Sequence, residues 1–393
     1  MIRRFLSGSL AVALFVGVVA GPTAAAVPQW KIIPSPSVGD DENGFADVAR
    51  IPGTKRFWAV GSWTDIFEST PDRTLIARWG GSAWTRIPSP NVGDQDNELS
   101  AVSVRSRSNA WAVGSAEDPA EVPKTLIEHW NGHAWTVVPS PNEGGAADEN
   151  HLSDVRAFSA TDVWAVGGST SNGTLTMHRD AAGWSIVPAP DVAGRHCSLA
   201  AVTGVPGSSR RFAVGSCVDQ ATGDSRTLIE RWNGTGWTIV PSPAPGVSST
   251  LTDVVAVSGH ELWAVGDSRA PGLPGPTTGL TLRWNRHGWS EVASPSAPPP
   301  VGETHLLGAS VVPGTSTLWA VGYTWAGSTG EYRVFSEFWD GTGWSIVATA
   351  PGLPGVAEFF SAVAATGPKD VWGVGAWFDP DLERLFTLTE HYA

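Results

Sequence analysis

The sequence is poor in several residue types, and each scarcity narrows the choice of function. Its 393 residues include 2 Cys, which allow one intramolecular disulfide at most, and 2 Met and 3 Tyr. Charged residues are only 16% of the chain, which argues against a disordered polyelectrolyte. Lys+Arg number 25 against 38 Asp+Glu, and no basic run occurs, so the basic footprint of a nucleic-acid binder is missing. Helical periodicity is absent beyond the N-terminal region.

The first 26 residues have the pattern of a secretory signal peptide. An arginine pair, Arg3-Arg4, precedes an apolar run over Leu10–Ala20, and small residues follow it up to Ala26. This pattern predicts cleavage after Ala26 and export of the mature chain. The apolar run is too short for a stable membrane span, and no later run is longer. The arginine pair leaves both the Sec and the twin-arginine export routes open.

Tryptophan is abundant, with 21 copies, and most of them mark an internal repeat. The tetrapeptide Trp-Ala-Val-Gly or a close variant recurs seven times at intervals of 48–56 residues, beginning at Trp58, Trp111, Trp164, Phe212, Trp263, Trp319 and Trp372. Most repeats carry two further tryptophans at fixed places. A repeat of this length is the mark of an architecture built from identical supersecondary units.

Each repeat holds four short strand-like runs that are bounded by turn residues. In the second repeat, strands A to D are expected at Leu99–Val104, Ala110–Gly114, Lys124–Trp130 and Trp135–Pro139. Asn131-Gly132, between C and D, is typical of a hairpin turn. Seven units of four antiparallel strands predict an all-β fold, a seven-bladed β-propeller.

The two ends of the chain complement each other. The seventh repeat stops at Tyr392-Ala393, where strand C ends, and so lacks strand D. The missing phrase stands at the start of the mature chain, at Trp30–Pro36. We expect it to complete the last blade and close the ring, which removes exposed sheet edges. Residues 27–393 are then a single propeller domain.

One phrase carries a resemblance to a known group of repeats. Residues 231–243, Arg-Trp-Asn-Gly-Thr-Gly-Trp-Thr-Ile-Val-Pro-Ser-Pro, joined to Trp-Ala-Val-Gly, resemble the tryptophan-rich propeller repeats of secreted actinobacterial proteins and, more distantly, kelch-type blades. The resemblance covers nearly all of the mature chain. The kelch diglycine occurs only at Gly167-Gly168, and the Ser-x-Asp-x-Gly-x-x-Trp box of sialidase-type blades is absent. The resemblance implies the propeller fold and no single activity.

Strand direction places the A–B and C–D turns on one face and the longer B–C and D–A loops on the other. Variable loops on a rigid scaffold are the usual place of recognition. Three tryptophans fall outside the repeated columns and enter the B–C loops of blades one, six and seven: Trp63, Trp325 and Trp377. We interpret them as anchors for a glycan or a protein partner. The alternative is that they cover loop backbone.

Charged residues gather in the same loops. Blades one to three carry acidic stretches at Asp40-Asp41-Glu42, Asp94–Glu98 and Asp148-Glu149. Such carboxylates could attract Ca²⁺ or a cationic partner, and the competing interpretation is a solvated acidic surface. A basic column at the start of strand C is expected to form salt bridges with loop acids: Arg73, Lys124, Arg226 and Arg333. No other cofactor and no metal-ligand spacing is indicated.

Candidate catalytic residues precede strand A, near the mouth of the central channel. They are His151, His196 and His305 in blades three, four and six, together with Glu303 and Glu358. Histidine there could act as a general base or bind a divalent metal. Their offsets from strand A differ, and no His-x-His spacing supports a site.

The two cysteines flank strands A and B of blade four. Cys197 and Cys217 fall nearly opposite each other if the A–B turn centres near Pro206–Ser208. In an exported protein this placement predicts a disulfide.

Together these features predict a secreted, non-catalytic binding module, expected as a monomer, that recognises an extracellular glycan or protein through the B–C/D–A loop face. One alternative is a carbohydrate-active enzyme, a polysaccharide lyase or glycoside hydrolase, at the channel mouth. Another is a cell-envelope interaction scaffold. Neither a nucleic-acid partner nor a membrane span is expected.

Overall fold

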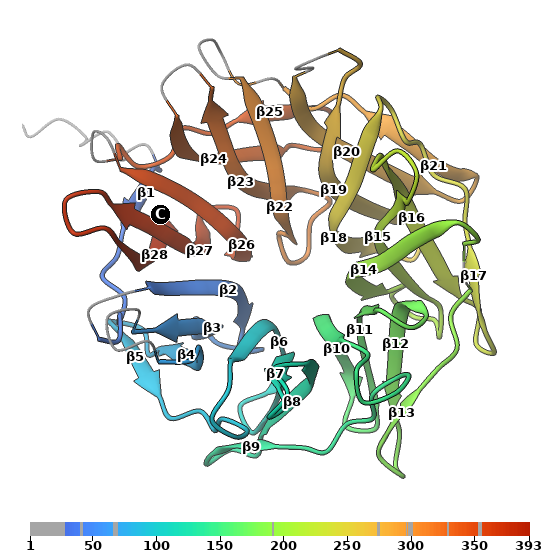
Figure 1. The fold of residues 1–393 in the computed structure, drawn as a ribbon. Helices are drawn as coiled ribbons and strands as arrows, with labels where there is room; N and C mark the ends of the chain where they lie inside the picture. The colour runs from blue at the N-terminus through green and yellow to red at the C-terminus, as the bar shows by residue number, and fades with distance from the viewer. Residues whose placement is uncertain are drawn as a thin grey trace, which may run out of the picture.

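The computed structural model describes residues 28–39, 42–65, 70–190, 192–272, 276–295, 297, 302–327, 330–352 and 356–393. Within these ranges every regular element is a β-strand, numbered β1 to β28 (Figure 1). A search of the same ranges finds no helix long and apolar enough to cross a membrane. The predicted signal peptide, residues 1–26, lies outside the described residues.

The strands repeat in the order that the sequence predicts. The A strands are β2 (Glu42–Arg50), β6 (Asn97–Ser106), β10 (Asn150–Ser159), β14 (Arg195–Gly204), β18 (Ser248–Ser258), β22 (Glu303–Val311) and β26 (Ala357–Gly367). The B strands are β3 (Phe57–Thr64), β7 (Asn109–Glu117), β11 (Asp162–Ser169), β15 (Arg211–Asp219), β19 (Glu261–Arg269), β23 (Leu318–Ala326) and β27 (Asp370–Asp379).

The two outer strands of each blade are shorter or more exposed. The C strands are β4 (Arg73–Trp79), β8 (Pro123–Trp130), β12 (Gly173–Arg179), β16 (Ser225–Trp232), β20 (Thr277–Asn285), β24 (Glu331–Trp339) and β28 (Arg384–Tyr392). The D strands are β5 (Trp84–Ile87), β9 (Trp135–Val137), β13 (Trp184–Ile186), β17 (Trp237–Ile239), β21 (Gly288–Val292), β25 (Trp344–Ile346) and β1 (Trp30–Ile32).

Each blade pairs its strands antiparallel in the order A-B-C-D. In the described part of the chain, blades five and six are joined into one larger sheet by a single parallel pairing of Thr277 with Glu303. Figure 1 shows the blades arranged around a central space, with the A strands innermost. This is the architecture of a β-propeller, as the repeats predict.

The N-terminal segment belongs to the last blade. β1 pairs antiparallel with β28, with Trp30 opposite Tyr392. Beyond β1, the N–H of Ile33 donates to the carbonyl of Thr389 at 2.8 Å. The pairing predicted between the two ends of the chain is therefore present, although they are separated by the whole sequence.

The repeated tryptophans pack between neighbouring blades. Trp58 on strand B of blade one contacts Trp130 and Trp135 of blade two, with ring centroids 5.0 and 5.3 Å apart. Blades seven and one meet in the same way, through Trp372 and Trp79 at 4.5 Å. Aromatic pairs of this kind add to the stabilisation that their buried area provides. The tryptophan columns thus form the interfaces between blades.

The glycine of Trp-Ala-Val-Gly is required by a bulge in strand A. A Cβ on Gly61 would lie 2.0 Å from the carbonyl oxygen of Gly44, beside the register shift between Phe45 and Asp47. The equivalent glycines meet strand A at 2.0–2.1 Å in every other blade: Gly114, Gly167, Gly215, Gly266, Gly322 and Gly375. No larger residue fits this approach.

The predicted disulfide is confirmed. Cys197 on β14 lies directly opposite Cys217 on β15, with Cα atoms 4.0 Å apart, and their sulfurs are bonded. The bridge joins the two inner strands of blade four.

Candidate functional site

The B–C and D–A loops share one face, as strand direction predicts. The N–H of Asp72, in the B–C loop of blade one, donates to Asp96 Oδ1 in the next D–A loop at 2.8 Å. The N–H of Asn97 donates in turn to the carbonyl of Asp72 at 2.9 Å. Adjacent loops are therefore tied to each other through their backbones.

The Pro-Ser-Pro phrase after strand D anchors the D–A loops. Its serine hydroxyl meets a threonine hydroxyl near the start of strand C at 2.7–2.8 Å, in the pairs Ser89–Thr74, Ser140–Thr125, Ser242–Thr227 and Ser35–Thr387. The repeated Ser and Thr thus position the loop face. Sequence reasoning assigned them no role, although their recurrence in register was visible.

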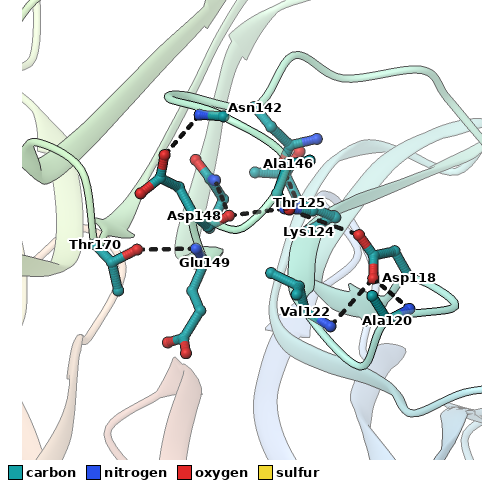
Figure 2. Close-up of polar contacts among 12 residues, drawn as sticks. Asp118, Ala120, Val122, Lys124, Thr125, Asn142, Ala146, Asp148, Glu149 and Thr170 are labelled. Atoms are coloured by element: carbon teal, nitrogen blue, oxygen red, sulfur yellow. Dashed lines mark hydrogen bonds and ion pairs between the residues drawn. The ribbon is translucent and has the colours of Figure 1, made fainter.

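The basic column of strand C holds the same loops through backbone carbonyls. Figure 2 shows Lys124, whose Nζ donates to the carbonyls of Ala146 and Asp148 at 2.7 and 2.8 Å and lies 4.0 Å from Asp118 Oδ2. The other members also donate to carbonyls: Arg73 to Gly93 and Asp94, Arg226 to Ala244 and Gly246, Arg333 to Val356. These basic side chains therefore hold the loops mainly through hydrogen bonds to backbone carbonyls, and the expected salt bridges contribute less.

The loop acids of blades two and three act mainly on nearby backbone and on each other. Asp118 Oδ1 accepts from the N–H groups of Ala120 and Val122 (Figure 2). Burial, a hydrogen bond from the protonated Glu98 carboxyl to Asp72 and the charges of the surrounding acids raise the pKa of Glu98 to about 7. Among the described residues, no three His, Cys, Asp or Glu side chains are grouped to hold a metal ion. Asp40 and Asp41 of the predicted acidic loops lie outside those residues.

A hollow of about 280 Å³ opens on this face in blade six. It is lined by Glu303 at the start of β22, Tyr323 and Trp325 near the end of β23, and Tyr332 at the start of β24. Trp325 is paired across the sheet with Glu303 on one side and Tyr332 on the other. Three aromatic rings beside one carboxylate have the mixed apolar and polar composition of a small-ligand site.

His305 adjoins this hollow and lies between two carboxylates. Its Nδ1 is 2.9 Å from Asp267 Oδ2, and its Nε2 is 3.2 Å from Glu303 Oε2. The imidazole stacks on the ring of Tyr323 with centroids 4.7 Å apart. Burial lowers the pKa of His305, but the hydrogen bonds and charges of Asp267 and Glu303 outweigh burial and raise it. Burial, followed by the same carboxylates and Tyr332, raises the pKa of the Tyr323 phenol.

Two predicted site residues, Glu303 and Trp325, line the hollow, and a third, His305, contacts Glu303 beside it. The contact between blades five and six through Asp267 was not foreseen. A signal for it exists in the repeats, because Asp267 and Tyr323 occupy the position after the Trp-Ala-Val-Gly glycine, where the other repeats have Ser, Gly or Ala. The unusual residues Asp267 and Tyr323 at this repeat position could therefore have pointed to the site.

The other two predicted anchors are half-buried, as Trp325 is, but they pack against the interfaces between blades. Trp63 packs against the hydrophobic cluster that contains Phe45, under the guanidinium of Arg86 at 5.4 Å. Trp377 stacks on Phe386 with centroids 4.8 Å apart. Of the three tryptophans, only Trp325 is part of the hollow in blade six.

The remaining catalytic candidates lie elsewhere. His151 and His196 belong to the neighbouring blades three and four. Desolvation lowers the pKa of His151. The charge of Glu149 raises this pKa in part, and the charge of His196 lowers it further. Glu358 is buried in blade seven, where its charge contributes to the raised pKa of Glu390. Within the described residues, the candidates occupy three separate places.

The chain is similar to known proteins in its fold alone. Neither a family model nor a curated protein matches the chain. A solved protein of unknown function from Dyadobacter fermentans DSM 18053 is similar at 11% identity, with 93% of this chain and 97% of that chain covered and a TM-score of 0.50. Trypanosoma rangeli sialidase is similar at 11% identity over 89% of this chain and 55% of its own, with a TM-score of 0.46. An ulvan lyase from a new polysaccharide lyase family is similar at 12% identity over 71% of this chain and 80% of its own, with a TM-score of 0.43.

Proposed function

We propose that the protein is an exported binding module that holds an extracellular glycan in the hollow of blade six. The observation that carries the proposal is the lining of the hollow by Tyr323, Trp325, Tyr332 and Glu303. Aromatic rings cover the apolar faces of a sugar, and a carboxylate accepts hydrogen bonds from its hydroxyls. Trp325 is the central anchor of the proposed site, and Trp63 and Trp377 extend it toward blades one and seven.

The proposal includes the setting of the site. The mature chain, residues 27–393, forms one propeller domain that acts as a monomer, and the pairing of β1 with β28 closes its ring. Export follows from the signal-like sequence before Ala26, and the Cys197–Cys217 bridge is of the kind that persists outside the cell. The blades form one scaffold around a central space (Figure 1), and a rigid scaffold of this kind keeps the hollow in a fixed position.

The test uses the mature protein on a panel of soluble and insoluble polysaccharides, with bound protein and released sugar read from the same wells. Trp325→Ala should weaken binding by about tenfold or more, the usual loss at an aromatic anchor. Tyr332→Ala provides a second variant that retains the fold, because Tyr332 is 40% exposed. Ile239→Ala, on the exposed outer strand of blade four, is the control. Binding that survives both site variants contradicts the proposal.

The same hollow supports a second candidate function, a carbohydrate-active enzyme of the lyase or hydrolase type. His305, held between Asp267 and Glu303 and stacked on Tyr323, places groups for proton transfer beside the aromatic wall. Released sugar that is lost in His305→Gln and Glu303→Gln would support this function. A cell-envelope scaffold, the third candidate, would give neither saturable sugar binding nor product and would capture a protein instead.

A further inference from the structure

The opposite face, formed by the A–B and C–D turns, carries arginines that the proposed function does not use. We call five of those in blades one to three the arginine track: Arg56, Arg78, Arg105, Arg107 and Arg156. Arg50 and Arg179 of the same blades donate to the carbonyls of Thr54 and Ala160 in the turns and are not counted in the track. Over the described residues, no ion pair joins any member of the track to a carboxylate within 4.0 Å. The track is therefore a run of positive charge on a chain whose net charge is −13.

Three members of the track gather at the edge of blades one and two. The guanidinium of Arg78 lies over the ring of Trp58, 5.4 Å from its centroid, and its Nε is buried without a hydrogen-bond partner. Desolvation lowers the pKa of Arg78, and the charges of Arg56 and Arg107 lower it further. Like charges are thus held close together with no counter-charge between them, which makes the cluster attractive to an anion.

The other two members of the track line a hollow beside the channel. Arg105 and Arg156 border a hollow of about 440 Å³, together with Phe158. Pro52, in the A–B turn of blade one, lines the same hollow and links it to the cluster around Arg56. The hollow that Arg105 and Arg156 line therefore reaches the A–B turn of blade one, the turn that also carries Arg56.

Arg156 also faces acidic groups inside the channel. Asp47, Asp154 and Asp253 lie there. Burial raises the pKa of each of them, and the positive charge of Arg156 offsets part of that rise. Each of these aspartates accepts a backbone N–H from the next blade, at Val102, Val202 and Ala309 respectively. Because Arg156 is partly balanced by these groups, the other four arginines supply the unbalanced charge of the track.

Three acids on this face have basic partners. Asp162 binds Arg211 at 2.7 Å, and Glu261 binds Arg283 at 2.8 Å. Asp370 binds Lys55 at 3.0 Å. The acidic loops described above lie on the other face, so in blades one to three the acidic loops and the arginine track are on opposite faces. Overall composition hides this segregation.

We propose that the arginine track binds an acidic polysaccharide, a linear chain that bears sulfate or carboxylate groups. Guanidinium groups bind such anions through paired hydrogen bonds. The hollow at Arg105 and Arg156 is concave, so it admits one narrow chain, whereas a nucleic-acid duplex and a lipid bilayer present surfaces too broad to enter it. The track and the hollow of blade six lie on opposite faces, so each site binds its ligand independently of the other.

The test measures binding of fluorescent dextran sulfate and polygalacturonate to the mature protein at about 50 mM and about 300 mM NaCl, with uncharged dextran as the blank. Arg56→Gln combined with Arg107→Gln removes two exposed members of the track. The matched control is Arg195→Gln combined with Arg269→Gln, which removes the same charge from the opposite face. We expect the track variant to bind about tenfold more weakly at low salt and the control variant to bind as the wild type does.

Each outcome decides the proposal. A preference for dextran sulfate or for polygalacturonate supports it and identifies the acidic group. Equal losses in the two double variants would show that net charge alone governs binding and would overturn the proposal, as would the absence of binding to both acidic polymers. Tighter binding of duplex DNA, or of phosphatidylglycerol vesicles, at the same salt concentration would also overturn it. Melting curves of both variants confirm that they are folded.

Discussion

Ser294 Oγ, in the loop that follows blade five, donates a hydrogen bond of 2.8 Å to Glu337 Oε2, and Glu337 is fully buried in blade six. Three more glutamates occupy the same place on strand C of other blades and are also fully buried: Glu128, Glu230 and Glu390. Burial raises the pKa of each of the four to about 8. At neutral pH these carboxyl groups are therefore mainly protonated in the folded protein.

These glutamates predict that the protein is less stable at pH 8 than at pH 5. In the unfolded chain they ionise near the ordinary value of 4.5, whereas in the folded protein they keep their protons until about pH 8. Unfolding therefore releases protons in this window, and each proton lowers the free energy of unfolding by about 1.4 kcal/mol per pH unit. Urea unfolding across the window measures the slope. Glu337→Gln should flatten it, and the exposed Glu291→Gln should not. Equal slopes in the two variants would contradict the assignment.

The strand A bulge predicts a large effect for a single methyl group. Gly266→Ala would place a Cβ 2.1 Å from the carbonyl oxygen of Thr250, which belongs to the paired strand and cannot rotate away. We expect a loss of about 3 kcal/mol or more in the free energy of unfolding, since overpacking against backbone is poorly relieved. Gly236→Ala is the control, because nothing lies within 4 Å of its added Cβ. Chemical denaturation of the two variants measures both free energies of unfolding. Similar losses would show that the backbone at the bulge moves to accommodate the added methyl group.

The first strand predicts that a short N-terminal deletion is costly. Trp30 packs against Trp319, Phe360 and Tyr392 with ring centroids 5.3–5.7 Å apart. Its Nε1–H donates to Ser336 Oγ at 3.2 Å. Removal of residues 27–36 should expose these aromatic rings and the edge of β28, and should lower the melting temperature far more than an ordinary terminal truncation.

A point variant separates packing from pairing in the same segment. Trp30→Ala keeps the strand and should cost about 3–5 kcal/mol, as for other large buried side chains. The exposed Lys31→Ala, one residue further on, is its control. Cooperative melting of the deletion variant at the wild-type temperature would show that β1 contributes little.

The repeats make the fold predictable because they record backbone requirements. Gly61 and its equivalents appear in every repeat since each faces the same bulge, and Trp58 and its equivalents recur since each fills the same interface. The match of Trp30 to the missing strand of the last blade follows from the same regularity. Cys197 and Cys217 could be paired in advance because a hairpin fixes which residues lie opposite each other.

The site was less predictable because its contacts cross between blades. His305 contacts Asp267 across the boundary between blades five and six. Contacts of this kind depend on the lengths of the intervening loops, and these lengths vary. Trp63 and Trp377 stand two residues after the strand B glycine, whereas Trp325 stands three residues after it and so points to the other face of its blade. All three are half-buried, and Trp325 alone lines the hollow of blade six. The arginine track was hidden for a related reason, since a net charge of −13 carries no information about which face holds each sign.

The position of His305 predicts a pH-dependent contribution to stability. Asp267 and Glu303 raise the pKa of His305 above its ordinary value of 6.5, so the folded protein holds this proton more tightly than the unfolded chain does. The resulting stabilisation is complete below about pH 6.5 and is lost as the pH rises through the folded-state pKa. His305→Gln should therefore lower the free energy of unfolding more at about pH 5.5 than at about pH 9. His196→Gln, at an exposed position in blade four, is the control. An equal loss at both pH values would mean that His305 contributes through packing on Tyr323 rather than through its charge, and would leave Glu303 free to act on a ligand without it.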